Sequence, residues 1–247
     1  MGVMIVTGGS RSIGAAIAEG AGRQGWDVAV NYRKEKVRAD AVVTAIEKSG
    51  RRAIAVQADM AEEQDILRLF ETVDRELGTV NALVNNAGID IENWLADVRL
   101  ADIDRIFRVN VYGPMLCARE AVKRMSTDKG GKGGAIVNIG SVAGRTGGMK
   151  RGGAYAASKA AVDTFTRALA LETAQQGVRV CCVRPGLTDT EMFGDATQRA
   201  EAREYARTGA PMGRMGTADE IAGLALFLCS DAASYITGFS YDVSGGR

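Results

Sequence analysis

Tyr155 and Lys159 are the two residues of this chain whose types and spacing most directly suggest chemistry. On a helix, residues four apart lie on one face, so the lysine ammonium would lie beside the phenol. A neighbouring positive charge favours the phenolate, and we therefore expect the pKa of Tyr155 to fall from about 10 toward neutrality. Such a tyrosine can donate a proton to a carbonyl oxygen or accept one from an alcohol. Taken alone, the pair also fits an ordinary amphipathic helix.

Ser141 stands where it could assist such a proton transfer. It follows the apolar run Ala135–Ile139 and is expected at the carboxyl end of a strand. Its hydroxyl could donate a hydrogen bond to a substrate oxygen on which negative charge develops. The chain has no histidine, so the sequence excludes histidine-based acid–base catalysis, Ser-His-Asp or Cys-His nucleophiles and histidine-containing zinc sites. We expect no metal site.

A glycine cluster follows the first apolar run, Val3–Thr7, and precedes a helical pattern. The segment reads Gly-Gly-Ser-Arg-Ser-Ile-Gly from Gly8 to Gly14. Glycine permits a tight turn and a close approach of the backbone to a pyrophosphate, which the N–H groups at a helix N-terminus can bind. The spacing differs from G-x-G-x-x-G, and a tight turn without a ligand is the alternative.

Basic residues occupy the position at which a dinucleotide site usually carries an acid for the ribose hydroxyls. The second predicted strand ends in Asn31-Tyr32-Arg33-Lys34. Arg33, together with Arg11 in the glycine cluster, could bind a 2′-phosphate through charge-assisted hydrogen bonds. The pattern favours NADP(H), with NAD(H) possible, although both arginines could also be solvated surface residues.

The composition indicates which partners are improbable and in which compartment the protein works. The 247 residues include 31 basic and 30 acidic side chains, a formal charge of +1 that gives no electrostatic case for nucleic acid or an anionic membrane. The four cysteines form no metal-ligand spacing, which is typical of a reducing compartment. No run approaches about 18 apolar residues, and the N-terminus does not resemble a signal peptide. We expect a soluble, cytoplasmic protein.

Short apolar runs alternate with helical patterns along the whole chain. This alternation predicts right-handed βαβ units in one α/β Rossmann domain over residues 1–247, with a doubly wound, seven-stranded parallel sheet and helices on both faces. A lid over a ligand crevice is expected at about 187–215. The predicted strands are Val3–Thr7, Val28–Asn31, Ala53–Gln57, Ala82–Asn85, Ala135–Ile139, Arg179–Val183 and Ser240–Val243. The predicted helices are Ile13–Gln24, Val37–Ser49, Glu62–Glu76, Asp102–Met125, Tyr155–Gln175 and Ala218–Leu228.

Six motifs in this order resemble those of the short-chain dehydrogenase/reductase family. They are Thr7-Gly8 with Ile13-Gly14, Asn85-Asn86-Ala87-Gly88, Asn110, Ser141, Tyr155-x-x-x-Lys159 and Pro185-Gly186. The similarity spans essentially the whole chain. It is nearest to the 3-oxoacyl-ACP reductase and glucose 1-dehydrogenase group, and it implies an NAD(P)-dependent oxidoreductase.

The resemblance also implies roles for individual residues. Ser141, Tyr155, Lys159 and Asn110 would be catalytic, with Asn110 holding a water that links Lys159 to solvent. Thr188 would bind the nicotinamide carboxamide, and Asp59 the adenine. The implied cofactor-binding residues are Gly8, Ser10, Arg11, Ser12, Ile13, Gly14, Tyr32, Arg33, Asp59, Met60, Asn86, Ala87, Gly88, Tyr155, Lys159, Pro185, Gly186 and Thr188. For Asn86 to Gly88, a turn that merely stabilises the sheet is nearly as good an interpretation.

Two positions depart from the family pattern. Ser12 stands where relatives usually have glycine, and it could crowd the pyrophosphate or donate a hydrogen bond to it. Leu171 stands where ACP reductases commonly carry an arginine that grips the acidic carrier, which counts against acyl-carrier substrates. The substrate pocket is expected to include Val142, Met149, Met192 and Phe193, a partly apolar set that suits a modest carbonyl or alcohol.

Three functions remain in competition. The first is an NADP-dependent oxidoreductase that transfers hydride between the nicotinamide and a carbonyl or secondary alcohol, with a sugar 1-dehydrogenase as an alternative. The second is a non-catalytic NAD(P)-binding regulatory protein of the same fold. The third, a sugar epimerase or dehydratase of the longer related branch, needs a further substrate domain for which 247 residues leave no room. The resemblance implies a homotetramer that assembles through the long helices.

Overall fold

Seven short strands, most of them apolar along their whole length, form one parallel sheet in the order β3-β2-β1-β4-β5-β6-β7. The computed structural model describes residues 2–193 and 196–247. Because the order reverses between β1 and β4, the carboxyl ends of these two strands flank a crevice of the kind that binds ligands in doubly wound sheets. The strands are β1 Val3–Val6, β2 Asp27–Tyr32, β3 Ala53–Gln57, β4 Val80–Asn85, β5 Gly134–Ile139, β6 Val178–Pro185 and β7 Ser240–Val243. Every predicted strand is confirmed.

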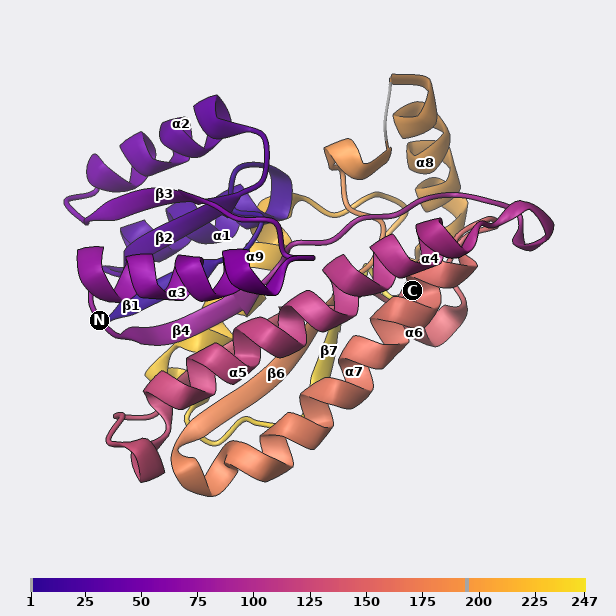
Figure 1. Ribbon diagram of the computed structural model, residues 1–247. Helices are drawn as coiled ribbons and strands as arrows, with labels where there is room; N and C mark the ends of the chain where they lie inside the picture. The colour runs from indigo at the N-terminus through magenta and orange to yellow at the C-terminus, as the bar shows by residue number, and fades with distance from the viewer. Residues whose placement is uncertain (1, 194–195) are drawn as a thin grey trace.

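Helices cover both faces of the sheet, as the strand–helix alternation predicts (Figure 1). One hydrophobic core lies between the sheet and α1 Ser12–Arg23, α2 Lys36–Glu47 and α9 Ala218–Cys229. The other lies beneath α3 Glu63–Glu76, α5 Gly113–Met125 and α7 Gly153–Thr173. The fully buried side chains of Met4 and Ile5, neighbours on β1, point into opposite cores, as the alternation of a strand requires.

The predicted helix Asp102–Met125 is divided into three parts. The structure has α4 Leu100–Phe107, a five-residue π-helix η2 at Arg108–Tyr112, and then α5. Pro114 in the first turn of α5 has no N–H to donate to the Asn110 carbonyl four residues earlier, which disfavours continuous α-helix at this point. The π-helix, whose turn is wider than that of an α-helix, therefore contains Asn110.

The predicted lid region contains a helix that apolar periodicity does not reveal. η5 Glu191–Phe193 is followed by α8 Ala196–Gly209, whose buried residues include Ala202 and Ala206, a pair too small to mark an apolar face. With Leu187 and Met215 these alanines form a separate small core. The remaining short elements are η1 Leu95–Asp97, η3 Thr127–Lys129, α6 Ala143–Thr146, η4 Ala174–Gln176 and η6 Asp231–Ala233.

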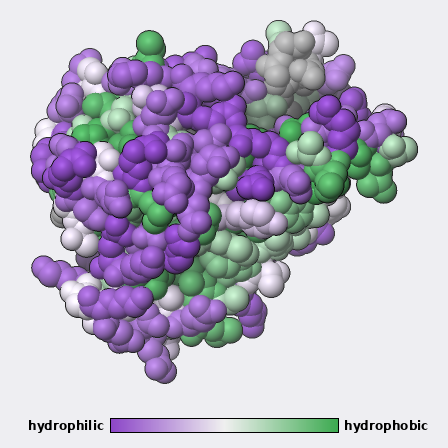
Figure 2. All heavy atoms as spheres, in the orientation of Figure 1, coloured by the Kyte–Doolittle hydropathy of each residue, from purple (hydrophilic) through white to green (hydrophobic). Residues whose placement is uncertain are grey.

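The surface is uneven in hydropathy. Figure 2 shows mainly hydrophilic residues over α2 and α3, whereas apolar residues gather over α7 and at the loop between β4 and α4. The exposed apolar residues of these regions include Trp94, Leu95, Leu100 and Leu171. Within residues 2–193 and 196–247, no helix is both long and apolar enough to cross a membrane. All four cysteines are buried and unbridged.

Candidate active site

The sequence-predicted residues converge on one cleft at the carboxyl ends of β1, β4, β5 and β6. Its volume is about 560 Å³, and it extends from the glycine turn to α7 and the lid region. The residues proposed from the sequence that line it are Gly8, Ser10, Arg11, Ser12, Ile13, Gly14, Tyr32, Arg33, Asp59, Met60, Asn86, Ala87, Gly88, Ser141, Val142, Met149, Tyr155, Lys159, Pro185, Gly186, Thr188 and Met192. Asn110 lies behind this lining, and the side chain of Phe193 lies outside the described part of the chain.

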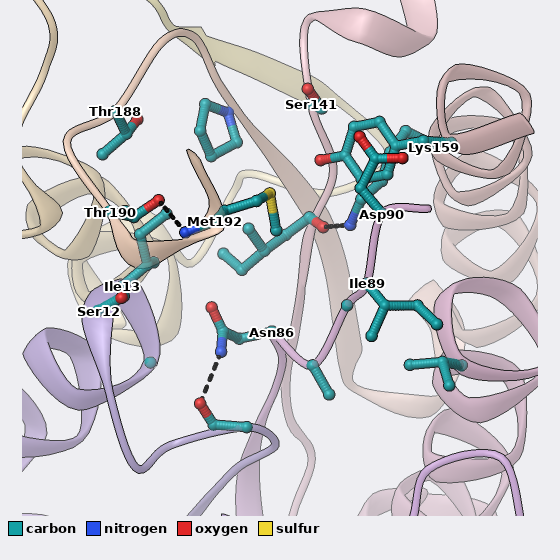
Figure 3. A pocket seen from close by; sticks show the side chains of 18 of the residues that line it. Ser12, Ile13, Asn86, Ile89, Asp90, Ser141, Lys159, Thr188, Thr190 and Met192 are labelled. Atoms are coloured by element: carbon teal, nitrogen blue, oxygen red, sulfur yellow. Dashed lines mark hydrogen bonds between the residues drawn. The ribbon is translucent and has the colours of Figure 1, made fainter. Parts of the chain in front are cut away.

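Figure 3 shows the two ends of this cleft. Ser12, Thr188 and Met192 lie at one end, Ser141, Asp90 and Lys159 lie at the other, and Asn86 lies at the base between them. Residues far apart in the sequence thus face a common space, because each follows a strand that ends at the same edge of the sheet.

The glycine turn is held by its neighbours in the sheet. Gly8 has a φ of +61°, in the left-handed region that glycine adopts without steric cost, and its N–H donates to Asn31 Oδ1 at 3.0 Å. Asn86 Nδ2 donates to the carbonyl oxygens of Thr7 and Gly8 at 2.9 and 3.1 Å. The Asn86 side chain therefore stabilises the turn, as the alternative interpretation of this motif predicts. Asn86 also lines the cleft.

The N-terminus of α1 suits a pyrophosphate. Arg11 is its N-cap residue and makes no side-chain capping bond, so the first-turn N–H groups are left for a ligand at the cleft. A Cβ at Gly14 would overlap the Gly8 carbonyl oxygen, so glycine is required there. Ser12 has a φ of +50°, a left-handed conformation that costs a non-glycine residue about 1 kcal/mol. This explains physically why glycine suits the position.

Arginines line the cofactor edge of the cleft, and acids lie close to them. Arg33 lies 3.9 Å from Asp59, whose carboxylate also accepts a 2.8 Å hydrogen bond from Arg105. Burial raises the pKa of Asp59, but the Ala61 N–H and Arg105 outweigh it and hold that pKa below its usual value. The Asp59 side chain is thus engaged in ion pairs beside the position predicted for adenine.

A second acid, Glu191, reaches the cofactor edge of the cleft from the predicted lid region. Glu191 accepts hydrogen bonds from Arg11 at 3.0 Å and from Arg38 on α2 at 2.6 Å. These bonds hold the pKa of Glu191 below its usual value. Sequence analysis missed Arg38 and Glu191, since nothing in their spacing shows that residues 153 positions apart meet.

Tyr155 and Lys159 lie on one face of α7, as their spacing predicts. Lys159 Nζ is 5.6 Å from the centre of the Tyr155 ring and donates to the Ile139 carbonyl oxygen at 2.8 Å. Ser141 Oγ accepts a 3.1 Å hydrogen bond from the Ala143 N–H, which orients it at the end of β5. Proton donor, cation and hydroxyl therefore meet at one end of the cleft.

The prediction that the Tyr155 pKa falls is wrong when only the protein's own groups act on the phenol. Burial raises the pKa of Tyr155 to about 12, opposed by a hydrogen bond with Ser141 and reinforced by the negative charge of Asp90. Burial also lowers the pKa of Lys159 to about 8, so a part of the Lys159 population is uncharged near neutral pH. Its ammonium lies over the ring and binds a carbonyl rather than the phenol oxygen.

Asn110 positions the end of β4. Its Oδ1 accepts from the Ile89 N–H at 2.9 Å, and its Nδ2 donates to the Ile89 carbonyl at 2.9 Å and to Ser158 Oγ at 3.0 Å. The Ser158 hydroxyl donates in turn to the Tyr155 carbonyl at 2.7 Å, so the Asn110–Ser158 bond connects the π-helix to α7 next to Tyr155. The water relay implied by the family resemblance stays a prediction.

Comparisons with known proteins show the family to which this chain is similar. Residues 8–247 match the family model described as enoyl-(acyl carrier protein) reductase. The chain is 43% identical over 252 residues to the uncharacterized oxidoreductase YgfF of Escherichia coli K12, with the whole of both chains covered. It is 39% identical to the 3-oxoacyl-[acyl-carrier-protein] reductase of a Synechocystis species, over 99% of this chain and 96% of that one.

A solved structure shares the same fold. A short-chain dehydrogenase from Burkholderia cenocepacia, crystallised in complex with NADP, superimposes with a TM-score of 0.90 at 38% identity, covering 98% of this chain and 96% of that one. The chain therefore belongs to the short-chain dehydrogenase/reductase family, as its motifs indicate, and it is an oxidoreductase of that family.

Proposed function

We propose that this protein is an NADP-dependent oxidoreductase that interconverts a carbonyl compound and a secondary alcohol. The observation that carries the proposal is that two features meet in one cleft. One is the glycine turn that leads into the uncapped N-terminus of α1, and the other is the Tyr155–Lys159–Ser141 cluster. The first feature suits a dinucleotide and the second suits proton transfer.

The residues along the cleft would hold the cofactor in order. The glycine turn and α1 would bind the pyrophosphate, and Arg11, Arg33 and Arg38 would bind the 2′-phosphate. Asp59, Met60 and residues 86–88 would contact the adenosine, and Pro185, Gly186 and Thr188 the nicotinamide. The NADP complex of the Burkholderia relative supports this assignment. When bound, the nicotinamide supplies or accepts the hydride.

The chain's own residues would then move the proton. Tyr155 donates its hydroxyl proton to the carbonyl oxygen as that oxygen gains charge, and the reverse transfer accompanies oxidation. Ser141 orients the same oxygen by a hydrogen bond. Lys159 stabilises the phenolate that remains, and Asn110 positions α7 through Ser158. Val142, Met149 and Met192 would contact the substrate, with residues 187–215 as the lid.

Two alternatives are weaker. A non-catalytic regulator needs no Ser141, Tyr155, Lys159 and Asn110 set, and all four are present. A carrier-bound substrate is disfavoured, since Leu171 is 79% exposed at the position where ACP reductases present an arginine. Sugar 1-dehydrogenation stays the second candidate because an acidic residue, Asp90, lies in the pocket.

Fluorescence titration with NADPH and NADH in parallel, followed by an assay of NADPH oxidation with a carbonyl panel, tests the proposal. We expect micromolar NADPH binding, weaker NADH binding and turnover of at least one carbonyl. Absence of binding by either nucleotide would contradict both the proposed oxidoreductase and the non-catalytic NAD(P)-binding alternative. Nucleotide binding that is the same in the wild type and in Tyr155→Phe, without turnover of any carbonyl by either, would favour the non-catalytic alternative.

We also propose a cytoplasmic homotetramer. The four unbridged cysteines suit a reducing compartment, and the exposed apolar residues over α7 and near α4 suit contacts between subunits. Light scattering coupled to gel filtration should give about four times the 26.1 kDa chain mass. A monomer at micromolar concentration would contradict this assembly.

A further inference from the structure

Asp90 presents an unpaired carboxylate oxygen at the catalytic end of the cleft. It lies two residues after the Asn-Ala-Gly motif, and its Oδ1 is buried without a hydrogen-bond partner among the described residues. A buried acceptor left unpaired costs about 1–3 kcal/mol, so such groups in native proteins call for an explanation.

Asp90 as a whole is half-buried, whereas the fully buried acids of the described chain are neutralised by basic residues. Asp27 lies 2.6 Å from Arg51, Asp102 lies 2.7 Å from Arg99, and Glu120 lies 2.8 Å from Lys123. Asp90 has no ion pair within 4.0 Å among the described residues. The structure thus neutralises its buried carboxylates and leaves the Oδ1 of Asp90 to a group that enters the cleft, while the Ile91 N–H binds the carboxylate.

The neighbours of Asp90 identify where it acts. Its charge acts on Tyr155, whose pKa it raises, and interacts attractively with Lys159. Its Oδ2 would lie 4.0 Å from a Cβ added at Gly152, so this glycine leaves the space beside the carboxylate open. Figure 3 shows Asp90 next to Lys159 and on the same side of the cleft as Ser141. A substrate bound for reaction at Tyr155 would therefore pass within reach of the carboxylate.

The state of the carboxyl suits an acceptor. Burial, followed by the charge of Glu92, raises the pKa of Asp90 to about 6, so the group is mainly ionised at neutral pH and can only accept hydrogen bonds. It would repel a substrate carboxylate or phosphate. The charge of Lys159 in the same place would repel a substrate ammonium, which leaves a neutral hydroxyl as the fitting donor.

We propose that Asp90 is a specificity-determining residue that accepts a hydrogen bond from a hydroxyl on the carbon next to the reacting carbonyl. The substrates would then be α-hydroxy ketones or aldehydes, and vicinal diols or sugars in the oxidative direction, rather than keto acids. This inference rests on the proposed oxidoreductase function and names its substrate class.

Three ketones of similar size test it with NADPH. Hydroxyacetone carries the hydroxyl, butanone replaces it by a methyl group, and methoxyacetone keeps the oxygen but has no O–H to donate. For the wild-type enzyme we expect kcat/KM for hydroxyacetone to exceed those for both others by about 10- to 100-fold, as for a hydrogen bond to a charged group. In Asp90→Ala we expect that preference to fall at least fivefold, because the variant lacks the acceptor for the hydroxyl. The intrinsic reactivities of the three ketones are the same for both enzymes, so they cancel in this comparison. Asp97→Asn, an exposed acid on the same loop, is the matched control and should keep the wild-type preference.

The outcomes separate the inference from the proposed function. Turnover of the ketones with no preference for hydroxyacetone, or with the same preference in Asp90→Ala, overturns the inference and leaves the function standing. A loss of NADPH affinity in Asp90→Ala with an unchanged preference assigns Asp90 to the cofactor and also overturns it. No turnover of any ketone, with NADPH binding intact, overturns the proposed function and the inference with it. Circular dichroism of Asp90→Ala confirms that the variant is folded.

Discussion

The Glu191 carboxylate of η5 lies 3.0 Å from the guanidinium of Arg11 in the glycine turn. It also binds Arg38, so one acid engages two of the three arginines proposed for the 2′-phosphate of NADP. An anion of the protein thus occupies a position suited to an anion of the cofactor, and it connects the lid to the cofactor edge.

Replacement of Glu191 should therefore strengthen NADPH binding. In Glu191→Gln both arginines become available, and we expect the NADPH dissociation constant to fall about threefold to tenfold, while NADH binding changes little. Parallel fluorescence titrations measure both. Glu204→Gln, which breaks an exposed pair with Arg207 on α8, is the control. Equal weakening of both nucleotides would instead mean that Glu191 holds the lid closed over the cofactor.

Loss of Arg33 should discriminate between the two nucleotides. Arg33 lies 3.9 Å from Asp59, too far for a strong ion pair, and is thus available to a phosphate. We expect Arg33→Ala to weaken NADPH about 10- to 100-fold and to leave NADH nearly unaffected. Arg23→Ala, at the end of α1 farther from the glycine turn, should change the affinity for neither nucleotide. An unaltered ratio of the two dissociation constants would remove Arg33 from the 2′-phosphate site.

Ser12→Gly should stabilise the protein. The φ of +50° at Ser12 is free of cost for glycine, so we expect the free energy of unfolding to rise by about 1 kcal/mol in urea denaturation. NADPH affinity should stay constant or improve. Ser12→Ala keeps the strain and lacks the hydroxyl, so it separates the two effects. A marked loss of NADPH affinity in both variants would show that the hydroxyl contacts the pyrophosphate.

Tyr155→Phe should reduce turnover by about 10²–10⁴-fold and leave NADPH binding near normal. Since the protein groups raise the Tyr155 pKa to about 12, the phenol stays protonated at neutral pH. Alcohol oxidation, which needs the phenolate, should then accelerate steadily from pH 7 to pH 10. A plateau reached by pH 8 would show instead that the working pKa is near neutrality.

Asp90 should make the stability depend on pH. Its folded pKa of about 6 exceeds the usual aspartate value of 3.8, so protonation favours the folded state below about pH 4, and this stabilisation is lost as pH rises through 6. In Asp90→Asn at pH 8 we expect the free energy of unfolding to exceed that of the wild type by about 1–2 kcal/mol after allowance for solvent screening, with a correspondingly higher Tm, and we expect no difference at pH 4. Calorimetry at the two pH values measures this, with Asp97→Asn as the exposed control. An equal shift at both would point to packing rather than charge.

The sequence by itself determined the parts that depend on local pattern. Seven apolar runs predicted seven strands, because a strand buried on both faces must be apolar throughout, and the four-residue spacing placed Tyr155 and Lys159 on one face. Local pattern missed α8, whose buried face is alanine, and the division of Asp102–Met125, which Pro114 favours.

Only the tertiary structure decided the electrostatics and the long-range contacts. Burial reversed the expected pKa shift of Tyr155, since desolvation depends on what packs around the phenol and not on its spacing from Lys159. The pairing of Arg11 with Glu191, 180 residues apart, and the position of the unpaired Asp90 Oδ1 in the cleft arise from folding alone. Strand ends distant in sequence meet at one sheet edge, and the chemistry of the cleft is set by which side chains meet there.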